Sequence, residues 1–230
     1  MEITDLKKYK GTTYEAEIDN QRKIYLHIDI ITDFGIAKGM ILEREQLKKI
    51  IYASNFRRAY QYSLYCLDYR DYSAEEIYEK LMKTYKNEKL CLDVVRKLAR
   101  ADIINDKRYA EKLARRYVES KKYGLKRARR EIILKGIDED TADEMLARYD
   151  EVFYENLVYL IESKYCRQLR DKNDRKEIEK VKGILFRYGY GFDDINRAVR
   201  EYFENADLSE DKKNGDKSWN GIAWLFKKSR

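Results

Sequence analysis

The residues that could carry out chemistry in this chain are mostly cations, and they gather in one stretch, residues 107–135. This stretch holds twelve Lys or Arg and three Glu, a net charge of +9, whereas the whole chain of 230 residues carries +7. The basic character therefore belongs to this segment. Such a density of cations favours a surface that binds a polyanion or an acidic partner. A merely solvated face is the alternative, since Lys and Arg also solubilise proteins.

The same stretch has the hydrophobic period of two consecutive helices. Between residues 107 and 122 the apolar side chains recur every three or four positions, and the cations fall on the opposite face. Tyr123 and Gly124 interrupt this pattern, so we predict a second helix from Leu125. Arg129 lies nearer the apolar stripe, where it serves packing or a local salt bridge. The other exposed cations are the candidate partner- and DNA-binding residues: Arg108, Lys112, Arg115, Arg116, Lys121, Lys122, Lys126, Arg127 and Arg130.

Residue combinations typical of catalysis are missing from the sequence. The single histidine, His27, lies in a strand-like segment without a cysteine or repeated carboxylate at ligand spacing. Gly189-Tyr190-Gly191 begins like a dinucleotide-binding motif, but Asp194 stands where the third glycine belongs. The carboxylates between Asp138 and Glu144 could hold a divalent ion, or gather at a helix N-terminus. We favour the second interpretation, and we predict no catalytic residue, no metal and no cofactor.

The composition indicates a globular protein built of long helices. The chain is 43% hydrophobic and 40% charged, and it has ten glycines and no proline. Three widely spaced cysteines, Cys66, Cys91 and Cys166, predict neither a disulfide framework nor a zinc site. No apolar run resembles a secretion signal or a membrane span. We expect a soluble, cytoplasmic monomer without membrane contact.

The N-terminal part of the chain differs from the rest. Residues 13–18 and 23–28 are rich in β-branched and aromatic residues around the turn residues Asp19 and Asn20, so they predict a hairpin. Residues 42–53 have a helical period. We expect residues 1–54 to form a small extension of a β-hairpin plus a helix.

A helical period dominates from residue 55 onward. Ser73 and Glu76 form a capping box, and Gly136 and Gly189 are predicted helix stops. Leu81, Ile132 and Leu185 take similar places in their helices, 51 and 53 residues apart, as in a helical array.

The predicted fold is mainly α: tandem three-helix repeats that form an elongated curved array, with the small β-containing extension at its N-terminus. Residues 55–205 would hold three tandem three-helix repeats. Residues 206–230 would be a polar linker and an apolar tail with Trp219 and Trp224, which docks on the array or on a partner.

Four segments, in matching order and spacing, resemble the motifs of the RecX family of recombinase regulators. They are Arg70-Asp71-Tyr72-Ser73-Ala74-Glu75-Glu76-Ile77 with Lys80-Leu81; Ile103-Ile104-Asn105-Asp106-Lys107-Arg108-Tyr109-Ala110-Glu111; Tyr123-Gly124 with Glu131-Ile132 and Lys135-Gly136-Ile137; and Leu185-Phe186-Arg187-Tyr188-Gly189-Tyr190. The likeness covers about residues 56–204, and the N-terminal part looks like an extension found in some members. The chain departs from the family where the loop of residues 83–89 lacks a glycine and Leu125 replaces a frequent proline.

The resemblance implies a non-enzymatic regulatory protein of bacterial recombination, DNA repair and the SOS response. Such proteins bind the RecA recombinase–DNA filament, lie along its groove and usually restrain its assembly and activity. The partners would be the RecA filament and single-stranded or filament-bound DNA. A sequence-independent DNA-binding protein that acts without recombinase is the alternative, and a scaffold for acidic proteins is a third class.

Overall fold

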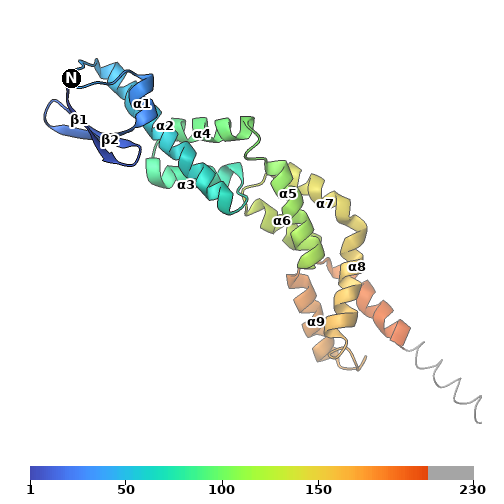
Figure 1. Cartoon of the computed structure of the whole chain (residues 1–230). Helices are drawn as coiled ribbons and strands as arrows, with labels where there is room; N and C mark the ends of the chain where they lie inside the picture. Colours follow the sequence, from blue (N-terminus) through green and yellow to red (C-terminus); the bar gives the residue numbers. More distant parts are fainter. Residues whose placement is uncertain (207–230) are drawn as a thin grey trace, which may run out of the picture. The chain divides into compact units, whose positions relative to one another are not determined.

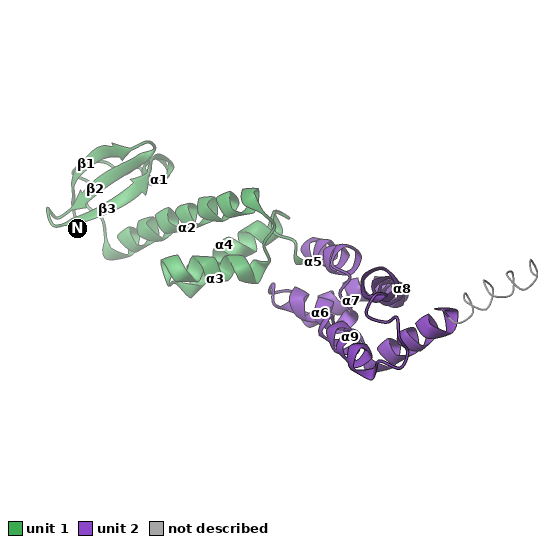
Figure 2. Cartoon of the chain, turned by 90° about the horizontal axis from the view of Figure 1, so that it is seen from below, with its two compact units in different colours: residues 1–106 green, residues 107–230 purple. Residues whose placement is uncertain are grey.

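The computed structural model describes residues 1–206, so the predicted tail with its two Trp lies outside the described residues. The chain divides into two compact units, one of residues Met1–Asp106 and one that begins at Lys107. Figure 2 shows the two units in different colours, and Figure 1 shows that helices make up most of the described chain. No helix among residues 1–206 is both long and apolar enough to cross a bilayer.

The first unit begins with a three-stranded antiparallel sheet in the order β1-β2-β3. The predicted hairpin is confirmed, since β2 (Thr13–Ile18) pairs with β3 (Arg22–His27). Asp19 and Asn20 form its turn with positive φ angles of 51° and 53°, a conformation that these residue types tolerate. β1 (Ile3–Lys10) was not predicted. Its lysine-rich outer half hides the alternation of a strand, because those side chains are exposed at an edge of the sheet.

His27 ends β3 and caps the short helix α1 (Ile28–Asp33), where its Nδ1 accepts a hydrogen bond from the Asp29 amide at 3.2 Å. The capping contact gives the single histidine a local structural role.

Helix α2 (Arg44–Tyr69) joins the sheet to the helices of the first unit. Leu47 and Ile50 in its first half pack with the sheet, and Ala59 and Cys66 in its second half pack with α3 (Ala74–Tyr85) and α4 (Glu88–Arg100). We expected this helix to end at residue 53, but no proline or glycine interrupts it there, and it continues. The division of domains at residues 54 and 55 stays a prediction, and α2 spans that point.

The helix caps of the first unit follow the sequence closely. The capping box is confirmed: Ser73 Oγ accepts from the Glu76 amide at 3.0 Å, and Glu76 Oε2 accepts from the Ser73 amide at 3.3 Å. These bonds satisfy amides that the first turn of α3 cannot satisfy itself.

The second unit contains two successive groups of three helices (Figure 1). The first group is α5 (Asp106–Arg115), α6 (Leu125–Ile133) and α7 (Glu139–Leu146). The second is α8 (Asp150–Leu160), α9 (Arg175–Arg187) and a helix over residues 192–206. α5 and α8 each continue into a π-helical turn, η1 (Arg116–Ser120) and η3 (Ile161–Tyr165), and the 3-10 turn η2 (Ala147–Tyr149) precedes α8. The predicted helix stops Gly136 and Gly189 have φ angles of 74° and 97°.

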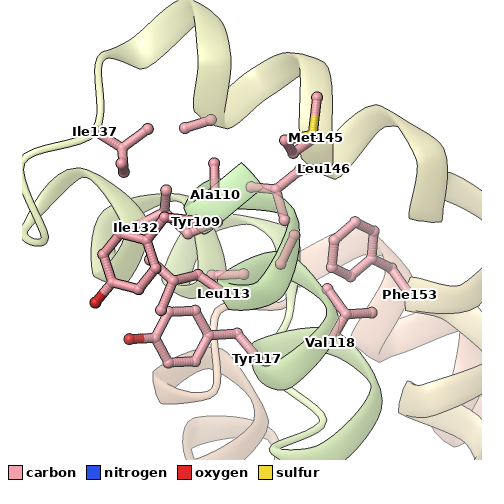
Figure 3. Close-up of a cluster of buried hydrophobic side chains, with 13 residues drawn as sticks. Tyr109, Ala110, Leu113, Tyr117, Val118, Ile132, Ile137, Met145, Leu146 and Phe153 are labelled. Atoms are coloured by element: carbon pink, nitrogen blue, oxygen red, sulfur yellow. The ribbon is translucent and has the colours of Figure 1, made fainter. Parts of the chain in front are cut away.

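Each three-helix group buries its own apolar core. Figure 3 shows the first core of the second unit, where Leu113 and Val118 of the basic segment meet Ile132 of α6 and Leu146 of α7. The apolar stripe predicted on the basic helix is buried throughout: Tyr109, Ala110, Leu113, Ala114, Tyr117 and Val118. The fold class of tandem three-helix repeats with a small N-terminal sheet is therefore confirmed.

The predicted repeat positions lie in corresponding places. Leu81, Ile132 and Leu185 are each 0% exposed, and each belongs to the middle helix of its group. The sequence spacing therefore marked a fully buried position in the middle helix of each repeat.

Replacement of Ile132 by Ala is expected to lower the free energy of unfolding by about 2–5 kcal/mol, because it leaves a cavity in an enclosed core. Urea denaturation followed by circular dichroism measures the change. The matched control is Leu134→Ala, since Leu134 is 70% exposed two residues away; its cost is expected to stay below about 0.5 kcal/mol. Equal losses in the two variants would contradict this core assignment.

Candidate cationic interface

The basic segment forms two helices, α5 and α6, around the turn at Tyr123-Gly124, as predicted; the π turn η1 that ends the first was not predicted. Of the nine candidate residues, Lys122 and Arg127 are half-buried, and the other seven are exposed. Of these seven exposed candidates, Arg115, Arg116, Lys121 and Lys126 form no ion pair with a carboxylate of the described residues.

The first group of cations lines a hollow of about 410 Å³ along α5, here called the α5 groove. Its lining residues are Arg108, Glu111, Lys112, Arg115, Arg116 and Ser120. The carboxylate of Glu111 forms an ion pair with Arg148 of η2 at 3.4 Å, so its charge is balanced outside the groove. The α5 groove is therefore a positively charged depression.

The π turn η1 ends the first basic helix. The Lys121 amide donates to the Arg116 carbonyl at 3.0 Å and the Tyr123 amide donates to the Tyr117 carbonyl at 2.9 Å, so this turn is wider than an α-helical one. Lys122 then takes a left-handed conformation with φ 55°. The chain reverses here, and the rings of Tyr117 and Tyr123 stack with centroids 5.8 Å apart.

The N-terminus of α6 is held by the turn that follows α9. The Gly124 amide donates to the Tyr188 carbonyl at 2.8 Å, and the Lys126 amide donates to the Gly189 carbonyl at 3.2 Å. The Tyr190 hydroxyl donates to the Lys122 carbonyl at 2.9 Å. The first amides of a helix lack partners within it, and α6 has no side-chain cap, so the neighbouring repeat supplies the acceptors. We call this contact the seam.

Two glycines make the seam possible. A Cβ atom at Gly124 would lie 2.5 Å from the Gly189 carbonyl carbon, and one at Gly189 would collide with the backbone of Arg127. Gly189 also has a φ of 97°, which side-chain-bearing residues rarely adopt. The two backbones therefore touch only because neither position carries a side chain.

Arg127 belongs to the seam. Its guanidinium carbon lies 4.0 Å from the ring centre of Tyr123 and 5.7 Å from that of Tyr188, and Nη1 donates to the Arg187 carbonyl at 3.3 Å. The Lys164 ammonium donates to the Tyr188 phenol oxygen at 3.0 Å, and this hydrogen bond lowers the Tyr188 pKa. Arg127 is thus a half-buried link between repeats, although its sequence position places it on the polar face.

The second concentration of cations joins α6 to the end of α9. A hollow of about 540 Å³, here called the α6 groove, is lined by Lys126, Arg127, Arg130, Phe186, Arg187 and Gly189. Phe186 and Arg187 were not predicted as site residues, because they lie more than fifty positions beyond the basic segment. Their membership of the fourth family-like motif was the available signal.

Comparison with known proteins shows which family the chain resembles. The models of the second and third three-helix domains of RecX match residues 105–146 and 150–199. Proteins named regulatory protein RecX from Bacillus velezensis and Clostridioides difficile are each 27% identical to the chain over 90% of its length, which covers 80% and 99% of those relatives. The chain belongs to the RecX family.

Solved RecX structures have the same fold. A crystal structure of regulatory protein RecX superimposes with a TM-score of 0.66 at 22% identity, over 87% of this chain and 98% of that one. The crystal structure of RecX from Lactobacillus salivarius gives 0.59 at 29% identity, over 65% and 97%. Since the family models meet between α7 and α8, the seam is a contact between the second and third RecX domains.

Arg129 is tied within the second RecX domain, as the salt-bridge alternative predicted. Its Nε lies 2.6 Å from Asp143 Oδ1, and its Nη2 lies 2.8 Å from Glu139 Oε2. Hydrogen bonds from Arg129 lower the pKa of Asp143. Asp138 caps α7 by accepting from the Thr141 amide at 2.8 Å, which lowers the Asp138 pKa. The acidic run therefore serves helix capping and α6–α7 pairing, and residues 1–206 contain no cluster of His, Cys, Asp or Glu suited to a metal ion.

Gly189→Ala is expected to lower the free energy of unfolding by about 2 kcal/mol or more, because it adds backbone strain and a collision with Arg127. Gly183→Ala, in the preceding helix α9, is the matched control. A Cβ there meets only the end of the Arg187 side chain at 3.8 Å, so the protein should gain about 0.5–1 kcal/mol. Thermal and urea unfolding measure both, and two changes of the same sign would contradict the seam.

The Arg129–Asp143 pair should appear in the pH dependence of stability. Because the folded pKa of Asp143 is lowered, its contribution is present above the unfolded pKa of about 3.9 and is lost as pH falls through the folded value. Asp143→Asn should therefore be less stable than the wild type at pH 7, and the difference should vanish in acid. The control is Asp140→Asn on the same helix; an identical pH profile for both variants would rule out the pair as the cause.

Proposed function

We propose that this protein is a non-enzymatic regulator that binds the RecA recombinase–DNA filament and restrains its assembly and recombination activity. The main support for this proposal is a set of exposed cations on α5, η1 and α6 that form no ion pair with a carboxylate of the described chain. Arg115 and Lys126 are two of them. Such side chains keep their full charge available for phosphates or for an acidic protein surface. The family membership supports a regulatory role, since the relatives are named regulatory proteins.

The chemistry of α6 favours binding that does not depend on base sequence. Helix α6 contains no Asn, Gln, Ser or Thr, the side chains that most often read base edges together with Arg. Lys and Arg placed without such neighbours mainly contact phosphates. A protein that must act anywhere along a filament needs this kind of contact.

Regulation without catalysis also suits the geometry. Glu111, which carries the single carboxylate among the described lining residues of the two grooves, is paired with Arg148. A protein that binds one state of a filament more tightly than another shifts the balance between them by that difference in affinity alone. A bound cationic surface is therefore sufficient for the proposed role.

The test reverses one free cation in each groove, Arg115→Glu with Lys126→Glu. Arg127 is left intact because it holds the seam. We expect binding to the recombinase–DNA filament to weaken about tenfold or more at low salt, with loss of inhibition of strand exchange. Fluorescence anisotropy and a strand-exchange assay measure the two effects.

The matched control is Arg175→Glu with Lys176→Glu, which changes the net charge equally. These exposed cations begin α9, on the order of 18 Å along the helix from the seam. Unchanged inhibition by the folded Arg115/Lys126 variant would exclude the proposed site. Equally tight, salt-dependent binding of the wild type to naked DNA, with or without recombinase, would favour the alternative of a general DNA-binding protein.

A further inference from the structure

An aromatic ring stands exposed among the cations of the α6 groove. Phe186, in the last turn of α9, is 54% exposed and does not pack into the core of its own domain. Lys126, Arg130 and Arg187 line the same groove, and no carboxylate does. Leaving a phenyl ring in water costs free energy, and neighbouring cations do nothing to cover it.

The combination of a free ring and several cations matches one chemical class of ligand. A nucleotide of a single strand offers a flat base for stacking and a phosphate for the cations, and every base has a face that can stack. The bases of a duplex are already stacked inside it and are out of reach of a surface ring. A ring in a cationic groove therefore distinguishes single from double strands, which cations alone do only weakly.

The seam holds this groove in a fixed geometry. The Phe186 carbonyl accepts from the Gly189 amide at 2.9 Å, and the Gly189 carbonyl accepts from the Lys126 amide at 3.2 Å. The backbone that carries the ring is therefore joined, through one residue, to the backbone that carries a groove lysine. Arg127 adds the bond to the Arg187 carbonyl. Because this backbone is already fixed, it need not become ordered when a nucleotide binds, and the entropic cost of stacking stays low.

We infer that the α6 groove is a subsite for one unstacked base of single-stranded nucleic acid, with Phe186 as the stacking ring and Lys126, Arg130 and Arg187 at the adjoining phosphates. The inference rests on the proposed function in that the groove belongs to the same cationic interface. It adds a residue that selects single strands over duplexes.

The experiment compares two oligonucleotides of equal length and charge, oligothymidylate and a strand in which the central nucleotides are abasic. Wild-type protein is expected to bind oligothymidylate on the order of tenfold more tightly. Phe186→Ala should abolish this ratio, leave binding to the abasic strand and to duplex DNA unchanged, and keep the fold. Phe186→Tyr should retain the ratio, and Phe186→Leu, which is apolar but has no ring, should lose most of it.

Phe192→Ala is the matched control, because Phe192 is 55% exposed in the same unit and does not line the groove. Equal wild-type affinity for the two strands, or a parallel loss for both in Phe186→Ala, would overturn the inference. So would weaker binding of Phe186→Ala to DNA-free recombinase with unchanged DNA binding, which would make the groove a protein-docking site. The two proposals can fail separately, since strand exchange by the Arg115/Lys126 variant tests the proposed function and the strand ratio of Phe186→Ala tests this inference.

Discussion

The contact between the backbones at Gly124 and Gly189 is the constraint on which the cationic interface depends. Helix α6 begins without a side-chain cap, so its first amides need acceptors from elsewhere. The turn after α9 supplies them at 2.8 and 3.2 Å. This exchange fixes the second RecX domain against the third, and it brings Phe186 and Arg187 beside cations that lie more than fifty residues earlier.

The net charge of the basic segment does not show which of its cations are available for binding, and the seam is part of the reason. The basic segment has a net charge of +9, but its cations do not all serve one purpose. Arg129 is bound to Asp143 and Glu139, and Arg127 is stacked on Tyr123 and bonded to a carbonyl. Arg115 and Lys126 have no such internal partner in the described chain. The candidate interface therefore consists of the cations that have no internal partner, and these cations keep their full charge for the proposed partner.

The sequence correctly predicted the features that depend on interactions between neighbouring residues. The hairpin, the Ser73–Glu76 capping box, the buried stripe of α5 and the helix stops at Gly136 and Gly189 depend on neighbours within a few residues. The fold class followed from these local features and their spacing, and the family was indicated by the resemblance of four segments to its motifs. The salt bridge of Arg129 was one of two alternatives that its position near the stripe allowed.

The parts that were missed depend on distant residues or on weak local signals. β1 is an edge strand whose outer side chains are charged, so it has no visible alternation. Helix α2 continues past residue 53 because the sheet and α4 both pack on it, which a local period cannot show. The π turns form where a backbone amide bonds to the carbonyl five residues back in place of the one four residues back, and the sequence does not show this difference. Arg127 and Phe186 acquired their environments only through the seam, across about sixty residues of chain.

The position of both grooves on one compact unit has a consequence for the proposed binding to a polymer. When one groove is occupied, the other is presented to the same polymer at an effective concentration set by a fixed geometry rather than by a flexible linker. Two individually weak contacts then add up to durable attachment. In the proposed function each contact can still be released by itself, so the joining of two helical triplets would give a regulator that is bound avidly but displaced stepwise.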